Sequence, residues 1–133
     1  MKIVLDTNVL ISALIFPGVS SEVFDFVVQN HEAIISDWIL AEFAEKCRDK
    51  FKIPPAILAE TLNHLREKLS FETPKGKKPQ ICRDSDDDNI LWLAASTDSE
   101  LIITGDQDLL VLKSYNKIHI ISPREYKANY MNV

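Results

Sequence analysis

Glycine, proline and cysteine are all scarce in this chain of 133 residues, which contains 3 Gly, 6 Pro and 2 Cys. The low glycine and proline content excludes collagen-like and low-complexity chains. Cys47 and Cys82 are too few for a disulfide framework and form no Cys-x-x-Cys motif. Long apolar runs are also missing, and Asp6 interrupts the N-terminal one, so we expect no membrane span and no secretory signal. The expected location is therefore cytoplasmic.

Positive charge is absent from one long stretch of the chain. No Lys or Arg occurs between Arg83 and Lys113, whereas residues 84–112 carry a local charge of −8 within a net charge of −5. A protein with net negative charge is a poor non-specific ligand for nucleic acid through its overall field. So concentrated an acidic stretch indicates either bound cations or repulsion that a partner relieves.

What the chain does contain is a regular alternation of short β-rich segments and helical segments. Strands are expected at 2–5, 33–36, 101–104 and 118–121, and helices at about 8–15, 20–30, 37–50, 55–69, 88–97 and 108–113, with a last turn after Pro123. This alternation predicts an α/β fold, a three-layer α/β/α sandwich with a short parallel sheet. The length predicts a single domain over residues 1–133.

Two acidic residues, Asp6 and Asp106, directly follow predicted strands. Ligands of open parallel sheets bind beyond the carboxyl ends of the strands, so we expect these two acids and one or more of residues 84–88 to meet there. Clustered carboxylates repel one another unless a cation neutralises them, and Mg²⁺ or Mn²⁺ binds through such oxygen ligands. The chemistry that uses carboxylate-held ions of this kind is phosphoryl transfer or phosphodiester hydrolysis.

Each of these carboxylates also fits a local structural role. Asp6 and Asp106 could form turns or helix caps, and the run at 86–88 could supply favourable charge at a helix N-terminus. Spacing alone does not choose between Glu42 and Glu45 on the helix at 37–50. The pattern at 84–88 begins like an EF-hand loop but lacks its glycine and its terminal glutamate, so a calcium loop is not expected.

Three motifs in order along the chain resemble those of PIN-domain ribonucleases: LDTNVLISAL (5–14), CRDSDDDNILWLAA (82–95) and LIITGDQDLL (101–110). The particular resemblance is to the toxin branch of bacterial and archaeal toxin–antitoxin modules. It extends over nearly the whole chain. It implies a PIN-like α/β/α sandwich, an endoribonuclease that depends on Mg²⁺ or Mn²⁺, and a protein antitoxin as partner.

The resemblance also assigns roles residue by residue. The four family acids fall on Asp6, Glu42, Asp88 and Asp106, with Asp87 as the rival for the third position. Asp6, Asp88 and Asp106 would hold the metal. The supporting polar positions are matched by Asn8, Ser12, Asp87, Thr104 and Asp108.

Two functions of other classes stay open at this point. One is a module that binds an antitoxin while its enzyme site is silent. The other is a Mg²⁺-dependent phosphohydrolase with Asp6 as nucleophile. Enzymes of that second kind carry a further acid two positions later, where this chain has Asn8.

An RNA substrate must approach this acidic centre with the help of basic residues. We expect the loop with Lys75, Lys77 and Lys78 to lie at the same edge, because it immediately precedes the acidic stretch. The competing candidates lie downstream of Glu42 and are Lys46, Arg48, Lys50 and Lys52. Trp38 and Trp92 have apolar neighbours and are expected in the core or an interface. The segment 8–28 holds more apolar residues than one core-facing side requires, which predicts a homodimer.

Overall fold

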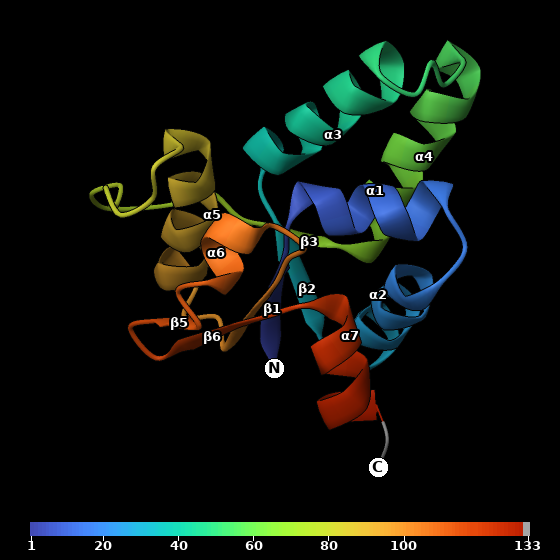
Figure 1. Ribbon diagram of the computed structural model, residues 1–133. Helices are drawn as coiled ribbons and strands as arrows, with labels where there is room; N and C mark the ends of the chain where they lie inside the picture. Colours follow the sequence, from blue (N-terminus) through green and yellow to red (C-terminus); the bar gives the residue numbers. More distant parts are fainter. Residues whose placement is uncertain (132–133) are drawn as a thin grey trace.

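A six-stranded sheet runs through the middle of this computed structural model, which describes residues 1–131 (Figure 1). The strands are β1 (Lys2–Leu5), β2 (Glu32–Ile35), β3 (Ser70–Phe71), β4 (Leu101–Ile103), β5 (Ser114–Tyr115) and β6 (Ile118–Ile121). Their spatial order is β3-β2-β1-β4-β6-β5, and only the β5–β6 pair is antiparallel. The predicted domain end at Val133 lies outside the described residues.

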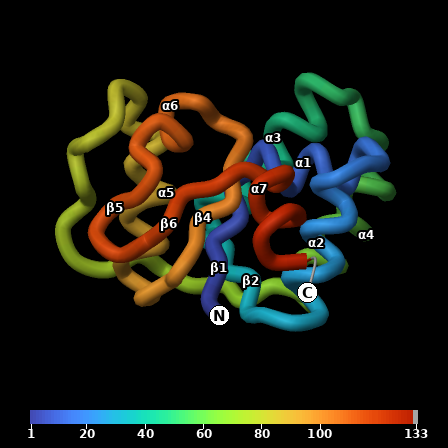
Figure 2. The backbone as a smooth tube through the Cα atoms, turned by 60° about the horizontal axis from the view of Figure 1, so that its bottom comes forward, coloured from blue at the N-terminus to red at the C-terminus, as the bar shows by residue number. Residues whose placement is uncertain are grey.

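Helices cover both faces of the sheet. They are α1 (Thr7–Ile15), α2 (Val19–Asn30), α3 (Asp37–Asp49), α4 (Pro55–Lys68), α5 (Ser85–Ser96), α6 (Gln107–Leu110) and α7 (Pro123–Tyr126), and α7 continues into a π-helical segment, Lys127–Met131. The two views show α5 and α6 on one side of the strands and α1, α2 and α7 on the other (Figure 2). The predicted α/β/α sandwich is therefore confirmed, with a mostly parallel sheet.

Local sequence signals explain where these elements begin. The side chain of Ser36 accepts a hydrogen bond from the Ile39 backbone N–H and caps α3, and Asp84 caps α5 through the Asp86 N–H. Proline at the first position of α4 has no N–H to leave unpaired. The central strands are buried on both faces, as their unbroken Ile, Val and Leu runs predict.

The strand order reverses between β1 and β4. From β1 the chain proceeds through α1 and α2 to β2 on one side, whereas β4 lies on the other side of β1 and leads to β6. The carboxyl ends of β1 and β4 are consequently neighbours, with Leu5 paired to Ile103 and the Asp6 N–H donating to the Ile103 carbonyl over 3.1 Å. Ligand sites of open α/β sheets form at such a crevice.

Two short strands were not predicted from the sequence. Strands β3 and β5 have two residues each and lie at the two edges of the sheet, so neither is long enough to show a period in its apolar residues. Strand β5 forms a tight hairpin with β6, and Asn116 in the turn has a φ of 55°. Asparagine tolerates this left-handed conformation better than most residues.

Within residues 1–131, no helix taken singly combines the length and the apolar character that a membrane span requires. Helices α1 and α2 meet both criteria only as a pair, and a bend of 107° separates them.

Candidate active site

A cavity of about 270 Å³ opens at the carboxyl edge of the sheet, beside α1, α3 and α5. Its lining holds six carboxylates and a single cation within the described part of the chain. The lining residues are Asp6, Thr7, Asn8, Trp38, Glu42, Lys46, Asp84, Asp86, Asp87, Ile90 and Asp106. Acids from four separate segments of the sequence thus converge on one space.

Asp6 is the most firmly held of these acids. It directly follows β1 and caps α1, and its Oδ1 accepts a 2.7 Å hydrogen bond from the Thr7 backbone N–H. Its Oδ2 accepts from Asn8 Nδ2 at 3.1 Å and from Thr104 Oγ1 at 2.7 Å. Burial raises the pKa of this carboxyl, while the hydrogen bonds from Thr104 and Thr7 act in the opposite direction.

Asn8 and Thr104 also connect Asp6 to the loop that follows β4. The Asn8 Oδ1 accepts from the Gly105 backbone N–H at 2.9 Å. Thr104 Oγ1 accepts from the Asp106 backbone N–H at 3.0 Å. Both side chains therefore orient the acids on two neighbouring strands, which is the geometry expected of the supporting residues around a metal site.

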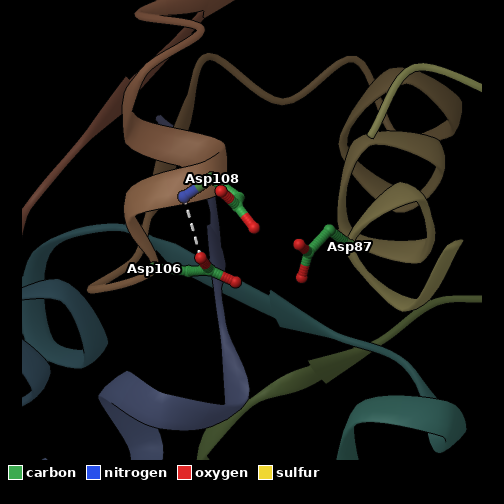
Figure 3. A group of neighbouring side chains, drawn as sticks. All are labelled: Asp87, Asp106 and Asp108. Carbon is green, nitrogen blue, oxygen red and sulfur yellow. Dashed lines mark hydrogen bonds between the residues drawn. The ribbon is translucent and has the colours of Figure 1, made fainter. Parts of the chain in front are cut away.

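Asp87 and Asp106 face each other across the cavity mouth. Figure 3 shows Asp87 reaching from α5 toward Asp106 and Asp108 at the start of α6. One ligand oxygen from each of the three lies within 4.8 Å of the others. The pKa of Asp87 is raised to about 7 by burial first, then by its hydrogen bond with Asp106 and by repulsion from Asp106, Asp6 and Asp84.

Asp108 is partly neutralised by a neighbouring cation. Arg83 Nη2 donates to Asp108 Oδ1 over 2.6 Å, and the Asp108 backbone N–H donates to Asp106 Oδ1 over 2.9 Å. Asp108 thus fixes Asp106 through its backbone while its own carboxylate is paired. This agrees with a supporting position better than with that of a primary ligand.

Asp88, expected as the third acid, lies elsewhere. It is buried, does not line the cavity, and its Oδ1 accepts the backbone N–H groups of Ile81 at 3.1 Å and Cys82 at 2.9 Å. Successive helical residues point about 100° apart, and this rotation turns Asp88 away from the cavity that Asp86 and Asp87 line. Asp87 therefore lies in the cavity lining, whereas Asp88 anchors the segment before α5 through its two backbone hydrogen bonds.

Of Glu42 and Glu45 on α3, only Glu42 lines the acidic cavity. The charge of Glu42 also raises the pKa of Asp6. Glu45 lines only an adjoining cavity of about 260 Å³, which shares Trp38, Glu42, Lys46 and Asp86 with the first. Ser12 is not brought to the acids. It lines a separate cavity together with Asn8, Ser20 and Pro123.

The basic loop does not lie where the sequence suggested. The Lys75 carbonyl accepts from Trp92 Nε1 at 3.0 Å and from Ser96 Oγ at 2.9 Å, both in the last two turns of α5. Asp87 lies in the first turn of that helix, roughly 13 Å away along the axis for the nine residues to Ser96. None of Lys75, Lys77 and Lys78 lines the acidic cavity, whereas Lys46 does.

The cavity suits a hard divalent cation. Its donors are carboxylate oxygens from Asp6, Asp87 and Asp106, the ligand type that Mg²⁺ and Mn²⁺ prefer. The hydroxyl of Thr7, which also lines the cavity, is buried and has no hydrogen-bond partner.

Comparison with known proteins adds three findings. The sequence profile of the PIN domain matches residues 2–108. The uncharacterized protein MJ1680 of Methanocaldococcus jannaschii is 33% identical over 129 aligned positions, which cover 88% of this chain and 78% of that protein. A chain in the crystal structure of VapBC2 from Rickettsia felis, bound to a DNA fragment from their promoter, superposes with a TM-score of 0.66 at 16% identity, over 92% of this chain and 98% of that one.

Proposed function

This chain belongs to the PIN domain family, and we propose that it is a divalent-metal-dependent endoribonuclease that hydrolyses RNA phosphodiester bonds. The observation that carries the proposal is the convergence of Asp6, Asp87 and Asp106 on one cavity at the reversal point of the sheet. Three carboxylates this close have a strong electrostatic demand for a cation. Phosphodiester hydrolysis is the chemistry that such a centre serves.

Asp6, Asp87 and Asp106 would hold the ion, Mg²⁺ or Mn²⁺, directly or through waters, and Glu42 would complete the acidic pocket. When bound, the ion would polarise the phosphate and lower the pKa of a water nucleophile. Thr104 and Asn8 keep Asp6 in one orientation, so little rearrangement is needed when the ion enters.

The environment of Asp6 supports water rather than Asp6 itself as the nucleophile. Both of its oxygens accept hydrogen bonds, three in all, from Thr7, Asn8 and Thr104. Hydrogen bonds to both oxygens occupy their lone pairs and make this carboxylate a weaker nucleophile. Cleavage in ¹⁸O-labelled water should therefore leave no label in Asp6, whereas the phosphohydrolase alternative requires it.

The motifs shared with the toxin branch support a further proposal about the cellular role. We propose that the chain is the toxin of a toxin–antitoxin module, acts in the cytoplasm as a single domain, and is bound by a protein antitoxin. Co-expression with the product of the adjacent gene, followed by purification of one chain, tests this. Recovery of a complex that no longer cleaves RNA is expected, and a complex that cleaves as well as the free chain would contradict it.

The nuclease assignment is tested with purified protein freed of metal by EDTA. A labelled single-stranded RNA should be cut after Mg²⁺ or Mn²⁺ is added, and Asp87→Asn should abolish cutting while the fold is retained. Asp98→Asn is a matched control, because Asp98 is exposed beyond the far end of α5 and its left-handed backbone conformation suits asparagine. Full cleavage in excess EDTA, or by Asp87→Asn, would exclude a metal nuclease at this site. Metal binding without cleavage of any RNA would favour the silent module.

A further inference from the structure

One side of α3 carries an aromatic residue, an acid and a base in regular succession. Trp38, Glu42 and Lys46 follow one another at four-residue intervals, so they stack along the same face of the helix, about 6 Å apart along its axis. All three line both the acidic cavity and the adjoining cavity of about 260 Å³. The two cavities therefore adjoin along α3. Figure 1 shows this helix leading away from the edge of the sheet.

Of the two positions expected for Trp38, the core or an interface, the structure shows a partly exposed one at the edge of the core. The Trp38 side chain packs against the core but is only half-buried. The residue also lines both cavities. Within residues 1–131 its indole N–H donates to no protein acceptor, whereas that of Trp92 donates to the Lys75 carbonyl. An indole that keeps an accessible surface and a free donor beside a candidate catalytic cavity is equipped to contact a ligand.

Lys46 is the only cation that lines either cavity in the described part of the chain. It forms no ion pair there within 4.0 Å, although Glu42 and Glu45 share the cavity walls with it. Its ammonium is thus available to an incoming anion. A phosphate beside it would also be held close to Glu42 and the acids around Asp6.

We infer that the α3 face formed by Trp38 and Lys46 binds a single-stranded segment of the RNA, with an unpaired base stacked on the Trp38 indole and a phosphate at the Lys46 ammonium. The inference rests on the proposed function in taking RNA as the substrate. Stacking on an aromatic side chain requires a base that is free of its duplex partners, so paired RNA is excluded from this surface. One aromatic and one cation supply affinity without sequence readout.

The test measures binding in EDTA, where cleavage cannot interfere. The chain has 2 Trp, so a Trp92→Phe background leaves Trp38 as the only fluorophore of its kind. Titration with an unstructured RNA oligonucleotide should quench this fluorescence, and the same strand annealed to its complement should not. Undiminished Trp38 fluorescence at saturating single strand would overturn the inference.

Affinity measurements on variants supply the second test. Trp38→Leu keeps an apolar side chain against the core but loses the aromatic ring, and it should weaken binding at least about five-fold relative to Trp38→Phe. Lys46→Gln should reduce the slope of log K against log salt by about 0.7, the value for one phosphate on a single strand. Lys117→Gln is the control, since Lys117 lines a cavity at the opposite end of the sheet. Equal affinity of the Leu and Phe variants, or an unchanged slope for Lys46→Gln, would overturn the inference.

These outcomes are separate from those of the nuclease test. Binding that depends on Trp38 without any metal-dependent cleavage would leave the inference standing and remove the nuclease function. Metal-dependent cleavage with the same Michaelis constant for Trp38→Leu and Trp38→Phe would support the nuclease function and overturn the inference about Trp38.

Discussion

The hydroxyl of Thr104 donates a 2.7 Å hydrogen bond to Asp6 Oδ2, joining two buried residues that lie 98 positions apart in the chain. The bond crosses from the end of β4 to the end of β1, which are paired strands. The same hydroxyl accepts the Asp106 backbone N–H, so one oxygen sets the position of two acids. The proposed metal site is therefore built on the edge of the sheet rather than on a loop alone.

Replacing Thr104 by valine should weaken metal binding while the cavity shape is kept. Valine is close in size, but Asp6 loses a donor and the Asp106 N–H loses an acceptor. We expect Mn²⁺ affinity to fall roughly 10- to 100-fold, the usual effect of losing a residue that orients a ligand. The free energy of unfolding should fall by about 1–3 kcal/mol. Calorimetric titration and denaturant unfolding measure both, with Thr73→Val in an exposed loop as control. An unchanged Mn²⁺ affinity would argue against this role.

Exchanging the two neighbouring acids on α5 should separate function from stability. Asp87→Ala should abolish cleavage and leave the fold intact, because Asp87 accepts no backbone hydrogen bond and is surrounded by like charges. Asp88→Ala should lower the free energy of unfolding by about 1–3 kcal/mol for each backbone N–H, of Ile81 and Cys82, that is left without an acceptor. Asp88→Asn retains an acceptor oxygen and should be milder. Loss of metal binding in Asp88→Asn with normal binding in Asp87→Asn would reverse our assignment.

The metal-free protein should lose stability as pH rises toward neutrality. The pKa of Asp87 is about 7 in the folded chain against 3.8 for the free side chain, so the folded state holds this proton more tightly. The contribution to stability is complete below about pH 4 and disappears as pH rises through 7. The pKa of His31 is lowered by burial and acts in the opposite sense, so the informative quantity is the difference between the parent and Asp87→Asn.

Denaturant unfolding of the metal-free protein between pH 4.5 and 8 measures that difference. Near pH 4.5 the two proteins should be similarly stable, because asparagine resembles the protonated Asp87, and toward pH 8 the parent should become the less stable of the two. Saturating Mg²⁺ should reverse this deficit, because the ion neutralises the ionised Asp87 of the parent. Identical pH profiles for the parent and Asp87→Asn would show that Asp87 titrates normally.

Neutralising the lysine loop should affect RNA binding less than neutralising Lys46. The backbone of Lys75 is tied to the C-terminal half of α5, and none of the three lysines lines the cavity. A triple replacement of Lys75, Lys77 and Lys78 by Gln should therefore leave cleavage in saturating RNA nearly unchanged. A larger loss of affinity and salt slope than that of Lys46→Gln would restore the loop as the RNA-binding element.

The homodimer stays a prediction, with a smaller surface than the sequence suggested. Most of the apolar side chains of α1 and α2 are buried in the core or pack against it. Phe16, by contrast, is 50% exposed, and its ring packs edge-on against that of Phe51 with 5.7 Å between the ring centroids. Light scattering should give twice the 15.1 kDa chain mass at tens of micromolar. Phe16→Glu should yield monomers, and Ile81→Glu, at a similarly exposed site, should not. Monomeric parent protein at that concentration would contradict the prediction.

Much of this protein could be predicted from local sequence signals. The unbroken Ile, Val and Leu runs at β1 and β4 and the alternation with amphipathic helices indicate a parallel sheet covered on both faces. That topology alone brings Asp6 and Asp106 together, because each follows a strand of the same sheet. Both side chains also cap a helix, Asp6 at α1 and Asp106 at α6, so each combines a structural role with a place in the candidate site.

Only the tertiary structure decided which acids face the cavity and which bases accompany them. Asp87 and Asp88 have the same chemistry and adjacent positions, and the start and rotation of α5 select between them. Lys75 is near the acids in sequence but lies by the far end of α5, whereas Lys46 is 40 positions from Asp86 and shares two cavities with it. Hydrophobic pattern and capping residues are local properties that a sequence displays directly. The direction of a side chain around a packed helix depends on contacts between distant segments, which no single segment encodes.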